Sequence, residues 1–342
     1  MVDFVELNND QRRELINTRQ RFEAWQEATA NERRYRGSLV WSQTKGTDYL
    51  LKSYYDEQGR RRQTSLGRRS AETEEVKQRF DAERARASEA RQQIEAALAR
   101  QAAINRALGL GRIPQTPARI LHALNKRGLL GTGLRVAGTN AVYAYEAACG
   151  VFVDPGITAT NDIDLLLDSR SRLHLVADAE FGGNNLLQII QSTDRSFKRS
   201  ANPFRASNGE GYLVDLIKPV RNPPWAAAPR PVGEQEDLEA AEIEGLVWLE
   251  NSVPFRQMVI DERGFPLWIV APDPRVFAVH KHWLSKRPER ERPKARRDHA
   301  QAAAVAELVR TFLPHLPFDA PELQVLPKKV VNDFLAEFPL PA

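Results

Sequence analysis

Two aspartates one residue apart interrupt an otherwise apolar run, residues 162–167, that has the composition of a β-strand. Because side chains of a strand alternate between its faces, Asp162 and Asp164 point to one face and Ile163 to the other. Two carboxylates on one face raise each other's pKa unless a cation lies between them. Mg²⁺ takes oxygen ligands from one or two carboxylates and leaves positions for substrate phosphates. The pair therefore predicts a site for Mg²⁺ (or Mn²⁺).

The alternative is a surface strand on which both carboxylates are solvated. Three consecutive leucines, Leu165 to Leu167, complete the same run. Such a run indicates a strand that is buried on both faces, and this favours the metal site.

A short strand over 134–137 ends in Gly138-Thr139, and a helix is expected over 140–149. The first turn of a helix has free backbone N–H groups and the positive end of the helix dipole, which favour a bound phosphate. Glycine permits close backbone approach, and the threonine hydroxyl can donate to a phosphoryl oxygen. Gly138 and Thr139 are therefore candidate nucleotide-binding residues.

A third carboxylate, Asp215, lies within the apolar strand 213–217. An unpaired buried charge costs several kcal/mol, so this residue needs a partner. If its strand lies beside the first acidic strand, the three aspartates can hold two metal ions. Asp215 would then also be placed to act as the base that activates an attacking hydroxyl.

The order of these features, strand–Gly-Thr–helix, then Asp-Ile-Asp, then Val-Asp-Leu, extends over roughly residues 117–218. It resembles the DNA polymerase β-like nucleotidyltransferase superfamily, and within it the minimal bacterial and AbiEii-toxin-like branch. The superfamily usually has Gly-Ser or Gly-Gly where this chain has Gly138-Thr139. A downstream helical region with Lys281 and an Arg-Asp pair ending at Asp298 resembles the region that follows the core in family members.

The resemblance implies a Mg²⁺-dependent nucleotidyltransferase that moves a nucleoside monophosphate from an NTP to an acceptor hydroxyl. It implies catalytic and metal-binding roles for Asp162, Asp164 and Asp215, and nucleotide contacts from Lys281 and Asp298. Lys281 is otherwise read as a solvated helix residue. RNA, such as tRNA, or a protein is favoured as acceptor over a small molecule, and the setting would be toxin–antitoxin or defence. The alternative is a catalytically silent adaptor of the same fold that binds nucleic acid or protein.

The elements that must position these residues predict an α+β fold: a mixed sheet with flanking helices, an N-terminal arm and a mostly helical C-terminal region. Three domains are expected: an arm, a nucleotidyltransferase core and a C-terminal mixed or helical domain, over 1–112, 113–222 and 223–342. The arm is expected to contain a helix, a β-hairpin with a possible third strand, and a long helix capped by Ser70, over 1–34, 37–55, 62–66 and 71–108.

Later segments are less regular. Residues 171–181 and 184–190 read as helical or mixed, and the Pro-rich stretch 219–231 as a linker or an extended wrap. Strands are expected over 253–260 and 266–270, and helices over 275–284, 300–312 and near 328–337. The charged run 286–297 reads as a solvated loop, with a phosphate-backbone contact as the alternative. His280, His282 and His299 lack cysteine partners, so a structural role is favoured over metal binding.

Arginines at 60–62 and 68–69 share the predicted arm sheet with Trp41, Tyr49, Tyr54 and Tyr55. Such a set suits a basic, aromatic nucleic-acid surface. The alternative, that the aromatic residues form the core of that sheet, is equally open.

Bulk composition narrows the class. The chain has 342 residues, a net charge of +4 and one cysteine, Cys149, which excludes a disulfide framework. No apolar run approaches the length of a membrane span and no signal peptide is apparent, so we expect a cytoplasmic protein.

Overall fold

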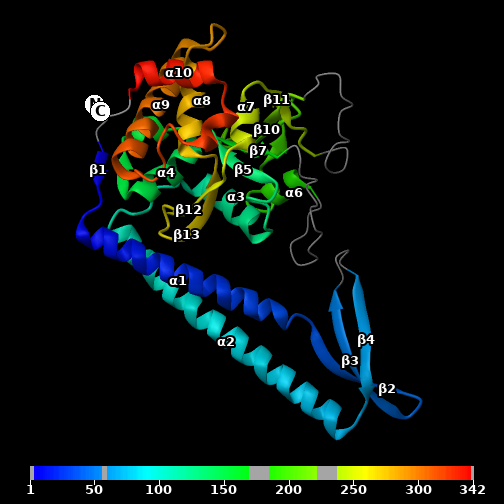
Figure 1. The fold of residues 1–342 in the computed structure, drawn as a ribbon. Helices are drawn as coiled ribbons and strands as arrows, with labels where there is room; N and C mark the ends of the chain where they lie inside the picture. The colour runs from blue at the N-terminus through cyan, green and yellow to red at the C-terminus, as the bar shows by residue number, and fades with distance from the viewer. Residues whose placement is uncertain (1–3, 56–59, 169–184, 222–236, 340–342) are drawn as a thin grey trace.

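A six-stranded mixed sheet organises the core of the computed structural model, which describes residues 4–55, 60–168, 185–221 and 237–339 (Figure 1). Its strands run in the order β5-β7-β10-β9-β8, and β11 also pairs with β10. Their bounds are β5 (Leu134–Ala137), β7 (Asp162–Leu167), β8 (Lys198–Arg199), β9 (Arg205–Ser207), β10 (Leu213–Pro219) and β11 (Ala241–Ile243). The two strands that carry the aspartates, β7 and β10, are adjacent and parallel.

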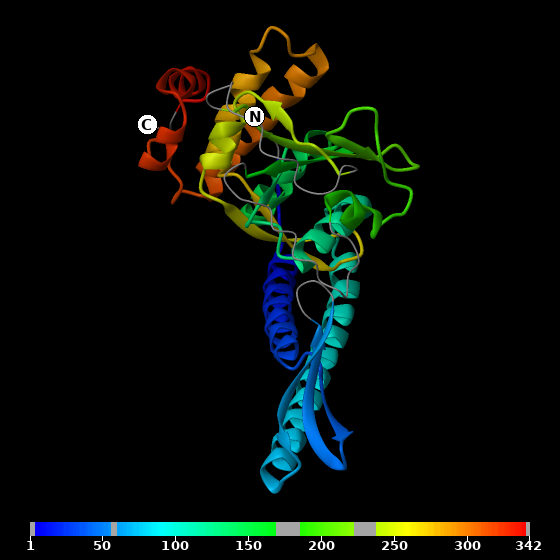
Figure 2. The ribbon, with the colours of Figure 1, turned by 90° about the vertical axis from the view of Figure 1, so that its right-hand side faces the viewer.

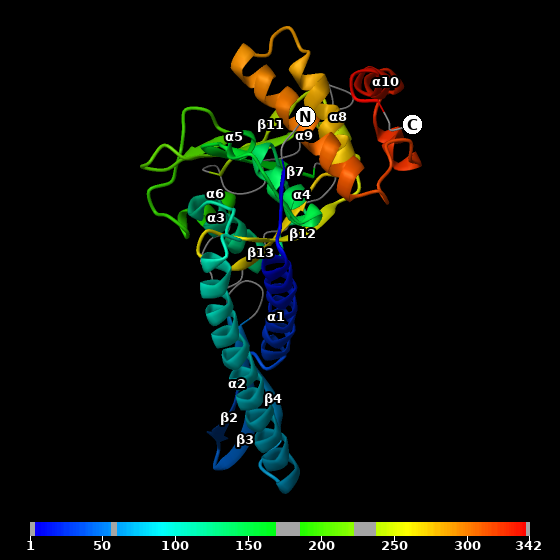
Figure 3. The same cartoon turned by 90° about the vertical axis from the view of Figure 1, so that its left-hand side faces the viewer.

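Helices surround this sheet, as the turned views in Figures 2 and 3 show. The N-terminal half of the core supplies α3 (Gln115–Lys126), the 3₁₀ turn η1 (Thr139–Ala141), α4 (Val142–Cys149), α5 (Pro155–Thr158) and α6 (Leu186–Gln191). The C-terminal half supplies α7 (Leu246–Asn251), α8 (Pro274–Ser285), α9 (Arg292–Phe312), η2 (Pro321–Val325) and α10 (Lys328–Glu337). Helices α8 and α9 pack on each other, and α9 also contacts α4.

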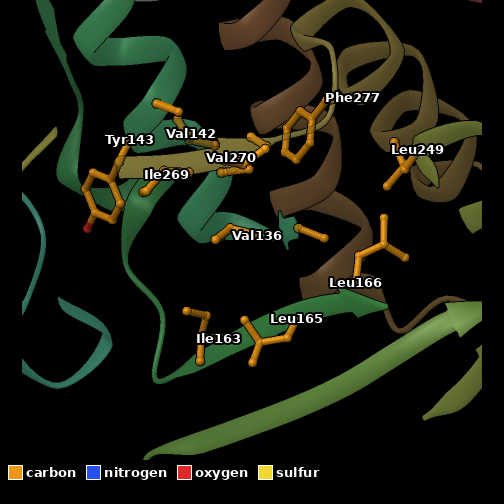
Figure 4. Packing of buried hydrophobic residues seen from close by; sticks show 14 of the residues in the cluster. Val136, Val142, Tyr143, Ile163, Leu165, Leu166, Leu249, Ile269, Val270 and Phe277 are labelled. Carbon is orange, nitrogen blue, oxygen red and sulfur yellow. The ribbon is translucent and has the colours of Figure 1, made fainter. Parts of the chain in front are cut away.

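One buried apolar cluster extends from Ile113 to Phe334, so helices on both sides of residue 222 share it. Figure 4 shows Ile163 and Leu165 of β7 in this cluster beside Val136 of β5. The hairpin β12 (Phe255–Ile260) and β13 (Pro266–Ala271) closes the cluster on the side that faces the arm.

The arm is a pair of helices, α1 (Asn9–Arg34) and α2 (Ala71–Ala107), that run side by side away from the core (Figure 1). Between them in the sequence lies an antiparallel sheet of β2 (Ser38–Thr44), β3 (Thr47–Tyr55) and β4 (Arg61–Arg68). Near the core, Phe22 and Leu98 pack on Met258 of β12. Ser70 caps α2, and its hydroxyl accepts from the Thr73 amide at 3.3 Å.

Two predicted segments differ from the structure. Residues Phe4–Glu6 form a strand, β1, that pairs with β6 (Val151–Val153) instead of beginning the first helix. The charged run predicted as a solvated loop is helical from Arg292, where Pro293 occupies the first turn of α9.

The predicted helix over 171–181 and most of the predicted Pro-rich linker lie outside the described residues. Within the described part of the chain, no helix is both long and apolar enough to span a bilayer.

Candidate active site

The fold brings the three predicted carboxylates onto one face of the sheet. Asp164 and Asp215 are register partners across the parallel pair β7–β10, and Asp162 lies two residues earlier on β7. Residues that are paired in register share a face, and so do residues two apart on a strand. The neighbouring strands required by the sequence argument are therefore present.

Gly138 ends β5 directly beside this face. Its φ is 60°, which favours glycine, and a Cβ at this position would overlap Oδ2 of Asp164. The structural reason for a glycine is therefore the Asp164 carboxylate, which occupies the space where a side chain would lie.

Thr139 begins the 3₁₀ turn that leads into α4, and its side chain is buried. Its hydroxyl oxygen accepts from Nε2 of Gln301 on α9 at 3.0 Å, which leaves the Thr139 O–H proton available for donation. The following Asn140 donates from Nδ2 to the backbone oxygen of Asp162 at 2.7 Å. These contacts fix the turn against β7 and α9.

The acidic pair carries charge that nearby cations only partly balance. Burial raises the pKa of Asp164 to about 6, with Asp162 and Asp215 adding to the rise and Lys281 and Arg290 opposing it. Asp162 accepts from the hydroxyl of Thr160. No ion pair is found for Asp162 or Asp164 among the described residues.

Asp215 has a cation of its own. Arg205, its register partner on β9, donates from Nε and Nη2 to the two carboxylate oxygens at 2.7 and 2.6 Å. This bidentate pair stabilises the buried carboxylate. Asp215 therefore needs no metal ion to explain its burial, contrary to the reasoning from the sequence.

Lys281 and Asp298, the two downstream candidates, meet in a buried ion pair beside the acidic face. Nζ of Lys281 lies 2.7 Å from Oδ1 of Asp298, and Arg290 in the α8–α9 connection binds Oδ2 at 2.7 Å. Two cations share one carboxylate, so this cluster has a surplus positive charge. Because Lys281 and Arg290 lower the pKa of Asp164, that surplus acts on the acidic pair.

The donor set suits one hard divalent cation. Asp162 and Asp164 are oxygen donors with insufficient balancing charge, which is the condition a bound cation relieves. Across the described ranges, no three acidic, histidine or cysteine side chains converge in a metal-binding arrangement. The described residues therefore fit a cation between Asp162 and Asp164, with Asp215 engaged by Arg205.

The histidines lie elsewhere. His280 is buried with its ring against Trp248 and Trp283, and burial lowers its pKa to about 3. His282 and His299 both contact the carboxylate of Glu337 on α10. The structural interpretation of these residues therefore agrees with their positions.

Sequence reasoning missed Arg205, Arg290, Asn140 and Gln301. Only Arg205 had a usable signal, because counting back across the Gly209–Gly211 turn places it opposite Asp215. Asn140 follows Thr139 in the turn η1, whereas Arg290 and Gln301 reach the site through the fold of the α8–α9 pair.

If clefts alone were used to locate the functional site, they would indicate a different part of the molecule. A cleft of about 450 Å³ lies between the arm and the core, and its lining residues, which include Phe22, Trp25, His122 and Phe265, contain none of the acidic cluster. The candidate site is therefore located by the chemistry of its side chains and not by the volume of a cleft.

Comparison with known proteins agrees with this geometry. A family model described as nucleotidyltransferase matches residues 115–326, more than half of the chain, whereas the resemblance seen in the sequence covered roughly 117–218 and a weaker likeness around Lys281 and Asp298. The match extends through α8 and α9 and so includes Lys281 and Asp298. No curated protein and no solved structure matches the chain. The chain belongs to the nucleotidyltransferase family, and it is a transferase of phosphorus-containing groups.

Proposed function

We propose that the protein transfers a nucleoside monophosphate from an NTP to a hydroxyl of a macromolecular acceptor, RNA or protein, with Mg²⁺ or Mn²⁺ held by Asp162 and Asp164. The observation that carries this proposal is the incompletely balanced carboxylate pair of β7, which packs on Gly138 and lies within the field of Lys281 and Arg290. The charge of the carboxylate pair and the charge of Lys281 and Arg290 are both balanced only by a polyvalent ligand that carries both signs of charge, such as a metal–triphosphate.

In the reaction, the acceptor oxygen attacks the α-phosphorus and forms a new P–O bond. The α–β anhydride bond breaks and pyrophosphate leaves. Thr139 donates its free O–H to a phosphate oxygen, and the surplus charge shared by Lys281 and Arg290 offsets the negative charge of the triphosphate. A bound divalent cation supplies further charge stabilisation of the phosphate oxygens.

The acceptor proton goes to Asp215 in this proposal. Both oxygens of Asp215 accept from Arg205, so one of these hydrogen bonds must open before the carboxylate can take a proton. Arg205 is thereby a positioning residue whose removal alters the pH profile of transfer.

Labelling tests the proposal. The protein is incubated with Mg²⁺, cell extract and each of the four NTPs, labelled at the α-phosphate, and the labelled species are identified. We expect one class of acceptor to gain label with the wild type and with Asp81→Asn, an exposed control on α2. Labelling that persists when Asp162→Asn and Asp164→Asn are combined would contradict the assignment.

The alternative is a silent adaptor, and the Arg205–Asp215 pair is the feature that favours it. Calorimetry separates the two functions. Mg²⁺-dependent NTP binding that is lost in Asp164→Asn supports the enzyme, whereas RNA or protein binding without any NTP binding supports the adaptor. Membership of a transferase family weighs toward the enzyme.

The toxin-like branch of the superfamily is part of the same proposal. It rests on the order Gly138-Thr139, Asp162/Asp164 and Asp215 seen in the sequence. Growth arrest on expression of the wild type, absent with Asp162→Asn, is the expected result. Normal growth at matched expression would remove the toxin assignment and leave the transfer chemistry unaffected.

A further inference from the structure

We propose that the outer face of the arm sheet binds a single-stranded segment of an RNA acceptor. The inference rests on the proposed function, because it names the acceptor class for the same site. It is carried by the side chains that the strand register places on the two faces of β2–β3–β4.

One face of this sheet packs toward α2. It carries Leu39 and Leu50, which are buried. Gly67 is the register partner of Leu50, and a Cβ there would lie 3.5 Å from the Thr73 methyl group of α2. This position shows that the face with Leu50 is the one that points toward α2. The buried leucines of this small sheet are therefore used against the helix.

The opposite face, here called the outer face, carries different side chains. Its register pairs include Tyr49 with Arg68 and Tyr55 with Arg61, so a tyrosine–arginine pair lies toward each end of β3. Tyr55 is 66% exposed, and both arginines are exposed. The remaining residues that alternation places on it are Ser38, Val40, Ser42, Thr44, Thr47, Leu51, Ser53, Gln63 and Ser65.

Charge on the outer face has one sign. No acidic side chain belongs to it among the described residues of the three strands. Arg61 donates to the hydroxyl of Ser53 at 2.9 Å, a neutral partner. By contrast, Arg69, beyond the end of β4, is paired with Asp48 and Glu74. The outer face therefore has positive charge that its own strands do not neutralise.

An exposed tyrosine, Tyr55, and a half-buried one, Tyr49, each beside an exposed arginine, match single-stranded nucleic acid. Unpaired bases stack on aromatic rings, and arginine binds the phosphates between them. A duplex keeps its bases stacked inside, so it would use the arginines and leave the tyrosine rings without a partner. The chemistry of this face thus favours RNA with an unpaired segment.

The position of the sheet sets the size of the acceptor. Thr73 contacts the sheet, whereas Asn105 donates to the Gly264 backbone oxygen in the core at 2.9 Å. From Thr73 to Asn105 the helix rises by 32 residue steps, or about 48 Å at 1.5 Å per residue. Figure 1 shows the sheet beside the part of α2 that is remote from the core. An acceptor that contacts Arg68 and also reaches the core must cover a distance of this order, so it is a macromolecule and not a nucleotide-sized molecule.

Binding of a labelled RNA hairpin with an unpaired 3′ tail to the full chain, measured without NTP by fluorescence anisotropy, tests the proposal. Arg61→Glu with Arg68→Glu should weaken binding tenfold or more. Loss of two phosphate contacts should also reduce the salt slope by about 1.4. Tyr55→Ala should weaken binding about fivefold or more.

The matched control reverses two exposed arginines on α2, Arg79→Glu with Arg84→Glu, and should change affinity less than twofold. Arg68→Gln is a milder second variant, and circular dichroism checks that each variant folds. An equal loss in the control overturns the proposal, because net charge would then explain the binding. Duplex DNA bound as tightly as the RNA, with no effect of Tyr55→Ala, also overturns it in favour of a duplex reader.

The same samples separate this inference from the proposed function. Asp162→Asn should retain RNA binding and lose transfer. RNA binding that depends on the arm without any transfer by the wild type would reject the proposed function alone. Transfer to RNA with binding insensitive to every arm variant would reject the outer face alone.

Discussion

Two strand faces of this molecule hold charge in opposite ways. The β7–β10 face of the core gathers three carboxylates on two adjacent strands, against cations from β9, α8 and the α8–α9 connection. The outer face of the arm sheet has exposed arginines spaced apart, each paired with a tyrosine. Partly buried charges interact strongly, whereas exposed charges more than about 10 Å apart are screened. The core face is therefore suited to chemistry that depends on exact position, and the arm face to holding a long polyanion.

The largest expected effect comes from the core face. Asp162→Asn combined with Asp164→Asn should lower NMP transfer by about a thousandfold or more, equivalent to about 4 kcal/mol. The reason is loss of the carboxylate pair proposed to hold the divalent cation. Charge reversal at Arg61 and Arg68 should lower transfer by about tenfold, and only at subsaturating RNA. Initial rates at two RNA concentrations make the measurement, and equal losses for both variants would abolish the distinction.

The next prediction compares the unfolding free energy lost when two ion pairs are broken, one in the core and one in the arm. Asp298→Asn leaves the buried Lys281 and the half-buried Arg290 without a carboxylate, which should cost about 3–5 kcal/mol of unfolding free energy. Lys77→Ala breaks the more exposed Lys77–Asp81 pair of α2 and should cost less than about 1 kcal/mol. Urea denaturation measures both. A small loss for Asp298→Asn would show that the core cluster is solvated like the arm.

The sequence could predict those features of the core and the arm that depend on residues close together in the chain. The acidic strand, its partner strand and the strand before Gly138 follow from local apolar pattern, and the structure has them as β7, β10 and β5. The helix that begins at Ala71 follows from Ser70, because a cap acts within one turn. Local rules therefore predicted both the candidate carboxylates and much of the arm.

Features that depend on distant partners were not predicted. β1 pairs with β6, about 150 residues away, so no local pattern marks it. Asp215 seemed to lack a partner because Arg205 becomes its neighbour only through the register of β9 and β10. The two sides of the arm sheet could not be assigned either, since a bulge between Leu50 and Leu51 sets which β4 residues face α2. The start of α9 is different, because Pro293 was a readable signal.

A third prediction concerns how much the charge of the core face lowers the free energy of unfolding. Burial and the neighbouring carboxylates raise the pKa of Asp164 from its ordinary value of 3.8 to about 6, so the folded protein disfavours its charge. Asp164→Asn should therefore raise the unfolding free energy at pH 7 by about 1–3 kcal/mol in the absence of metal. The gain should shrink as pH falls from about 6 toward 4, since wild-type Asp164 then takes up its proton in the folded state.

Thermal unfolding of both proteins between pH 4 and 7.5 measures this gain, and adding Mg²⁺ should raise the melting temperature of the wild type only. Asp81→Asn serves as the control, because its side chain is exposed on the arm. A gain that is constant with pH would mean that the charge of Asp164 is not its source.

The smallest effect tests whether the arm acts as a separate region. Ser70→Ala removes the hydroxyl that accepts from the Thr73 amide, and this should cost about 1 kcal/mol in the first turn of α2. Ser88→Ala, in the interior of the same helix, should be neutral or slightly stabilising. Hydrogen exchange should show faster exchange near Ser70 and in the adjoining sheet, with core amides and transfer to a short acceptor unchanged. Faster exchange in β7 or β10 as well would mean that the arm and the core unfold together, because a local cap can reach the core only through cooperative unfolding of the whole chain.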